Sequence, residues 1–146
     1  MRDPLDILTE WIVWASLEDK KDFETILLKG HLLIEITIDR VLLKSGIEKC
    51  EDYSFFRKVN ILRNVKECSN KLELIIPFLE RLNSLRNRLA HEALFDINNG
   101  EFERWSFDVY DKFKGTKFSK YTHRTKIVHS FSILSKNIID LIDEED

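Results

Sequence analysis

The sequence predicts an all-α bundle of four to five helices that forms one domain over residues 1–146. The chain contains only four Gly and two Pro, so few residues disfavour helix along its length. Apolar side chains recur three or four residues apart over most of the sequence, which is the period of an amphipathic helix. Asp, Ser and Asn residues precede several of these periodic segments, as helix N-caps do.

The first two helices are marked by local signals. Asp3 and Pro4 are typical of an N-cap followed by the first helical residue, and an amphipathic segment begins there. A second helix covers about residues 19–44. Gly30 lies in its middle, where glycine costs about 1 kcal/mol relative to alanine. We therefore expect a close helix approach or a bend at this position.

Two helices are predicted in the middle of the chain. Either Asp52 or Ser54 caps a short helix. The next helix begins at Asn70 with the character of a capping box, or else at Pro77, which is tolerated near a helix start. Its C-terminal end contains the polar segment 85–92.

The segment before the last helix fits two periods. Apolar and polar residues alternate between residues 105 and 113, which predicts a strand and favours a β-hairpin or irregular insert. A helix is the competing prediction, because four apolar residues also recur at helical spacing: Phe102, Trp105, Val109 and Phe113. A last helix follows over about residues 123–142.

Composition excludes some classes of protein. The formal net charge of −3 argues against a generally basic nucleic-acid-binding protein, so local charge has to be considered. Cys50 and Cys68 lack ligand-like spacing and are interpreted as reduced thiols. The apolar runs are shorter than the roughly 20 residues that cross a bilayer, and no signal peptide is recognisable. We expect a cytoplasmic protein without membrane association.

The polar segment 85–92 concentrates side chains that can perform chemistry. It contains two arginines, an asparagine and a histidine: Arg86, Asn87, Arg88 and His91. Histidine suits acid–base catalysis near neutral pH, and arginine binds phosphate and stabilises developing negative charge. Such a set fits RNA cleavage by the ribose 2′-hydroxyl, which needs neither a metal nor another cofactor. The alternative is a solvated polar helix face with His91 near the helix C-terminus.

The run Arg86-Asn87-Arg88-Leu89-Ala90-His91 resembles the signature of the HEPN superfamily, in which Arg and a polar residue precede His by a fixed spacing. Residues 30–35 and 55–62 also resemble helices of HEPN proteins of the mannitol-operon-repressor type. The resemblance implies a helical domain that dimerises and places the Arg and His of both protomers at a shared cleft. Many members look like metal-independent endoribonucleases of toxin–antitoxin or phage-defence systems. Others are non-catalytic and bind nucleotides, nucleic acid or proteins.

The leading hypothesis is a homodimeric HEPN-type endoribonuclease that acts on RNA. Arg86 would bind the scissile phosphate, His91 would be the acid or base, and Asn87 would hold the pair in register. Three further side chains are expected to support the site: His31, Glu35 and Arg88. An antitoxin or a nucleotidyltransferase is the partner that a toxin of this kind would have. The alternative is a non-catalytic regulatory or partner-binding module.

A second candidate region is the basic segment 112–126, in which aromatic residues interleave with cations and no acid occurs. Basic and aromatic side chains together hold single-stranded nucleic acid by charge and stacking. Four cations are candidate contacts: Lys114, Lys117, Lys120 and Arg124. The alternative is an ordinary solvated loop. No metal site is expected, because the histidines and carboxylates of the chain lack ligand spacing.

Overall fold

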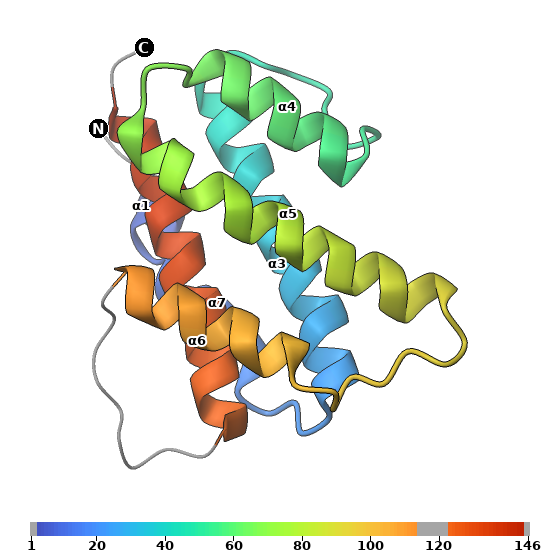
Figure 1. Cartoon of the computed structure of the whole chain (residues 1–146). Helices are drawn as coiled ribbons and strands as arrows, with labels where there is room; N and C mark the ends of the chain where they lie inside the picture. The colour runs from blue at the N-terminus through green and yellow to red at the C-terminus, as the bar shows by residue number, and fades with distance from the viewer. Residues whose placement is uncertain (1–2, 114–122, 145–146) are drawn as a thin grey trace.

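The computed structural model describes residues 3–113 and 123–144 and confirms an all-α fold. These residues form seven α-helices and a short 3-10 helix, with no strand among them. The elements are α1 (Pro4–Ile7), α2 (Thr9–Leu17), α3 (Phe23–Lys44), α4 (Phe55–Val65), α5 (Asn70–His91), α6 (Glu101–Phe113), α7 (His123–Ile139) and η1 (Asp140–Asp143). Figure 1 shows the long helices α3 and α5 crossing, with α4 on one side of α5 and α6 on the other.

The predicted first strand of a β-hairpin, at residues 105–113, is wrong, because these residues belong to helix α6. Phe102, Trp105 and Val109 are all buried, as the helical period requires. Phe107 would share a strand face with Trp105, yet it is exposed. The tertiary contacts of the helical face therefore override the local alternation. The expected second strand, at residues 116–121, lies outside the described residues.

The helix starts agree with the sequence in part. The Ser54 hydroxyl accepts a hydrogen bond from the Arg57 N–H at 3.1 Å and caps α4. Of the two predicted caps, Asp52 and Ser54, the second is therefore confirmed. Ser69, rather than the predicted Asn70, caps α5. Pro77 lies inside α5 and does not begin it. The N-terminal segment divides into α1 and α2, which adds to the predicted helix count.

Helix α7 is the central element, because it packs against α2, α3 and α6. Its apolar side chains are buried, and three of its serines are buried with them: Ser130, Ser132 and Ser135. Each serine hydroxyl donates to the carbonyl oxygen three residues earlier, so its burial leaves no unsatisfied donor. None of the helices described combines the length and apolar character that a membrane span requires.

The remaining contacts fix α5 between its neighbours. The Trp105 indole N–H of α6 donates to the Phe78 carbonyl oxygen of α5 at 2.9 Å. Arg81 and Asp108 form an ion pair of 2.8 Å between the same two helices. Leu82 and Leu85 are buried, so the opposite face of the C-terminal half of α5 is left for the polar segment.

Gly30 allows α3 to approach α7 closely, which confirms the expected close approach. A Cβ atom at this position would lie 2.5 Å from Cε1 of Phe131. The Phe131 ring has no room to withdraw, because it packs against the rings of Phe102 and Trp105 at centroid distances of 6.0 and 4.9 Å. The glycine is therefore required by packing and not by its backbone torsion angles.

We predict that Gly30→Ala lowers the free energy of unfolding by about 1–3 kcal/mol, because the added methyl overpacks the core. Urea denaturation of the variant and of the parent measures the difference. In a double-mutant cycle, Phe131→Leu should relieve part of the loss, so the two changes together cost less than their sum. A more stable Gly30→Ala protein, as helix propensity alone would give, contradicts this packing account.

Candidate functional site

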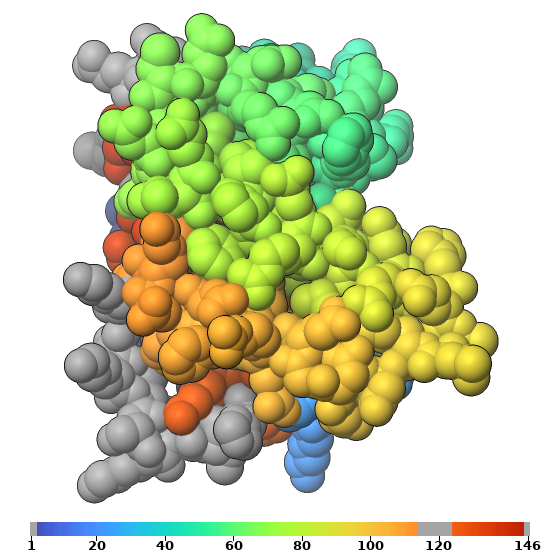
Figure 2. All heavy atoms as spheres, viewed as in Figure 1, coloured from blue at the N-terminus to red at the C-terminus, as the bar shows by residue number. Residues whose placement is uncertain are grey.

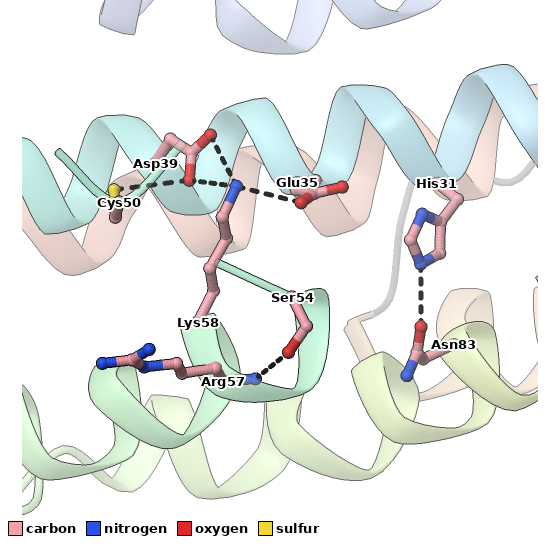
Figure 3. A network of polar contacts seen from close by, with 8 residues as sticks. All are labelled: His31, Glu35, Asp39, Cys50, Ser54, Arg57, Lys58 and Asn83. Atoms are coloured by element: carbon pink, nitrogen blue, oxygen red, sulfur yellow. Dashed lines mark hydrogen bonds and ion pairs between the residues drawn. The ribbon is translucent and has the colours of Figure 1, made fainter. Parts of the chain in front are cut away.

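Helix α4 is held against α3 by a buried lysine. Lys58 is only 2% exposed, and its ammonium lies 2.9 Å from Glu35 Oε2 and 2.9 Å from Asp39 Oδ1 (Figure 3). Burial alone would lower the pKa of Lys58, but the hydrogen bonds to Asp39 and Glu35 outweigh it and raise the pKa. The lysine therefore stays charged, and the Cys50 thiol donates to Asp39 beside it at 3.6 Å.

His31 links α3 to α5 next to this network. Its Nε2–H donates to Asn83 Oδ1 at 3.1 Å, and its ring lies 4.3 Å from the Phe55 ring of α4, measured between centroids (Figure 3). Burial lowers the pKa of His31, which is 6% exposed, and the charge of Arg86 lowers it further. The Asn83 hydrogen bond and Glu35 oppose the shift only in part. His31 is therefore neutral at pH 7.

Two adjoining hollows open between α4 and the C-terminal half of α5, where Figure 2 shows a notch in the surface. The smaller hollow has a volume of about 330 Å³, and the larger one about 510 Å³. Four residues line both: Phe55, Phe56, Asn83 and Asn87. The two hollows thus form one continuous depression, which we call the α4–α5 groove.

The three predicted catalytic residues all line the α4–α5 groove, but they divide between its two parts. Arg86 lines the smaller hollow, His91 lines the larger one, and Asn87 lines both. Arg86 Nη1 donates to Asn87 Oδ1 at 3.3 Å. The histidine that shares a hollow with Arg86 is His31, one of the predicted supporting residues.

Arg86, like Arg57 and Arg124, has no carboxylate partner among the described residues. Its side chain is half-buried, and it forms no ion pair with any residue of the described ranges 3–113 and 123–144. The His91 side chain is exposed and has no hydrogen bond to the described residues. Both side chains therefore retain free polar atoms toward the groove.

The other predicted supporting residues are engaged within the protein. Glu35 binds Lys58, as described above. The Arg88 guanidinium pairs with Glu101, lies 3.4 Å from Glu92 and stacks over the Phe95 ring at 4.7 Å from its centroid. Arg88 therefore joins the C-terminal end of α5 to the start of α6, although it also lines the larger hollow.

The predicted basic segment is described only at its end. Lys114, Lys117 and Lys120 lie outside the described residues. Arg124 Nη1 donates to the carbonyl oxygens of Glu18 at 2.9 Å and Lys20 at 2.8 Å. This guanidinium ties the start of α7 to the chain that follows α2.

Sequence reasoning missed two residues that line the groove, Asn83 and Phe56, and the buried Lys58 that holds α4 against α3; two of these three leave a signal in the sequence. Asn83 precedes Asn87 by four residues and His91 by eight, so all three share one face of α5. Lys58 falls among the buried positions of α4, where a lysine requires a carboxylate partner. The third is Phe56, whose exposure on the groove cannot be read from the apolar pattern.

No family model matches the chain, and no curated protein or solved structure matches it significantly. In the part of the chain that the structure describes, no group of three His, Cys, Asp or Glu side chains is arranged to hold a metal ion. The proposed function therefore rests on the groove and on the motif residues.

We predict that Lys58→Met lowers the free energy of unfolding by about 3 kcal/mol, because it leaves Glu35 and Asp39 facing each other without their cation. The matched control is Lys71→Met, which removes a more exposed ion pair of 3.5 Å with Asp140 and should cost less than about 1 kcal/mol. Chemical denaturation of both variants checks the difference. Equal losses would contradict a structural role for the buried network.

Proposed function

We propose that the chain is a metal-independent endoribonuclease of the HEPN type. The observation that carries the proposal is Arg86, a half-buried guanidinium without an ion pair in the described residues, which opens into a groove that His91 also lines. A partly buried arginine without a carboxylate partner is suited to a phosphate, which it binds through charge-assisted hydrogen bonds. The spacing of Arg86, Asn87 and His91, which resembles the family signature, supports the same choice.

The smaller hollow suits the scissile phosphate. Arg86 supplies the positive charge, and Ser54 to Phe56, at the start of α4, bring the positive end of a helix dipole to the same hollow. The Glu35 carboxylate also lines this hollow, but its charge is paired with that of Lys58 at 2.9 Å. Because His31 is neutral at pH 7, Arg86 is the cation that would stabilise charge on the pentacoordinate phosphorus of the transition state. Asn87 orients the guanidinium through the hydrogen bond to Arg86.

His91 is the proposed acid–base group, since it is exposed on the groove next to Asn87. As a base it would take the proton of a ribose 2′-hydroxyl, whose oxygen then attacks the adjacent phosphorus. The bond from phosphorus to the 5′-oxygen breaks, and that oxygen takes up a proton. The products are a 2′,3′-cyclic phosphate and a 5′-hydroxyl, with no net consumption of water in this step.

We infer that the enzyme works as a homodimer. The reaction removes a proton from the 2′-hydroxyl and delivers one to the 5′-oxygen, and a dimer supplies one His91 for each of these two roles. Apolar side chains left exposed between Leu5 and Ile12 and along α3 support an interface there. They are Leu5, Ile7, Leu8, Trp11, Ile12, Leu28, Leu32, Ile36 and Leu43. In a toxin–antitoxin or defence setting, an antitoxin or nucleotidyltransferase partner would restrain the activity.

A non-catalytic partner-binding module is the second candidate. It is favoured by the division of Arg86 and His91 between two hollows, and by the hydrogen bond that Arg86 already makes to Asn87. In this case the groove would bind a nucleotide or a protein without cleaving RNA.

We predict that the pure protein cleaves mixed RNAs in the presence of a chelator, and that Arg86→Ala and His91→Ala each lower the rate about 100-fold or more. Arg104→Ala is the matched control, because this arginine on α6 is 74% exposed and lies outside the groove; it should leave the rate unchanged. Gel analysis of the cleaved RNA gives the rates.

Absence of cleavage above the level of the Arg86/His91 double variant, with or without a co-expressed partner, would reject the nuclease. Size measurement of the same variants then separates the alternatives. Loss of the dimer in both variants, without any nuclease activity in the parent, would favour the partner-binding module.

A further inference from the structure

An exposed aromatic side chain stands at the junction of the two hollows. Phe56 is 65% exposed and lines both parts of the α4–α5 groove, whereas its neighbour Phe55 is buried against His31. A large apolar ring left open to solvent on the wall of a polar groove lacks a packing role. Such a ring provides a platform on which an unpaired nucleobase stacks.

The larger hollow has the wrong charge for a second phosphate. It is lined by the carboxylates of Glu80 and Glu92, and the arginine at its wall, Arg88, already pairs with Glu92 and Glu101. Carboxylates repel a phosphate but accept hydrogen bonds from the amino groups of a base. Glu80 can do this, since its ion pair with Arg63 is exposed and long, at 3.9 Å.

The remaining polar groups of the larger hollow suit the edge of a base. Asn60, Asn83 and Asn87 line it, together with the Ser84 hydroxyl. Asn60 Oδ1 and Asn87 Oδ1 already accept hydrogen bonds, from Arg63 at 3.4 Å and from Arg86 at 3.3 Å, so these amides offer their nitrogen donors to the acceptor atoms of a base edge. Asn83 uses its Oδ1 for His31 and so keeps its amide nitrogen free to donate.

We propose that the larger hollow is a nucleobase subsite. An unpaired base next to the phosphate at Arg86 stacks on Phe56, turns an exocyclic amino group toward Glu80 and turns its acceptor atoms toward the amide nitrogens of the asparagines. One single-stranded RNA thus binds in both parts of the groove, with its phosphate in the cationic part and its base in the acidic part. This inference rests on the proposed function, because the bound strand is the substrate of the nuclease. The subsite selects adenine, guanine or cytosine over uracil, because uracil has no exocyclic amino group.

The test uses a 2′-O-methylated RNA hexanucleotide that contains one 2-aminopurine and lacks every attacking hydroxyl. The parent protein should bind it and quench the fluorescence, as stacking does. Phe56→Ala should weaken binding about tenfold or more, whereas Phe56→Trp should retain it. The matched control is Phe107→Ala on α6, because Phe107 is 63% exposed and does not line the groove; binding should be unchanged.

Cleavage of unmodified RNA, measured in parallel, separates this inference from the proposed function. RNA cleavage with no effect of Phe56→Ala on binding overturns the base subsite and leaves the nuclease standing. Binding that depends on Phe56 without any cleavage supports the subsite and rejects the nuclease. Equal weakening by Phe56→Ala and Phe107→Ala, or a preference for uridine hexamers, also overturns the subsite.

Discussion

The buried ion-pair network of Lys58 with Glu35 and Asp39 fixes the wall of the α4–α5 groove. Helix α4 has only 11 residues, and a helix of that length is marginal without tertiary contacts. Its position therefore depends on a few buried side chains and on the lysine that two carboxylates of α3 hold. Because Phe55 and Phe56 begin this helix and line both hollows, the same network determines where the hollows open.

The scaffold behind the groove is apolar and tightly packed. Gly30 lets α3 lie directly on Phe131 of α7, and Trp105 secures α6 to α5. With Leu82 and Leu85 committed to the core, α5 presents Arg86, Asn87 and His91 on its outer side. The proposed division of labour follows from this layout, with a cation at one end of the groove and carboxylates at the other.

Much of the fold could be predicted from local patterns, whereas the site could be predicted only in part. Helical spacing predicts the all-α class, and Gly30 in the middle of a helix indicates a close contact with a neighbouring helix. The strand prediction for residues 105–113 was wrong, because their apolar residues fit both periods and the exposure of Phe107, between the buried Trp105 and Val109, decides for the helix. The polar contacts of Lys58 and His31 join residues far apart in sequence, so no local pattern contained them.

The chemical identity of the RNA ends tests the central claim most directly, since it reports the reaction itself. Mass spectrometry of products formed in chelator distinguishes the classes of cleavage. Attack by the 2′-hydroxyl, with Arg86 and His91 as the acting groups, predicts 2′,3′-cyclic phosphate and 5′-hydroxyl ends. Products with 3′-hydroxyl and 5′-phosphate ends, or activity that the chelator abolishes, would contradict the account.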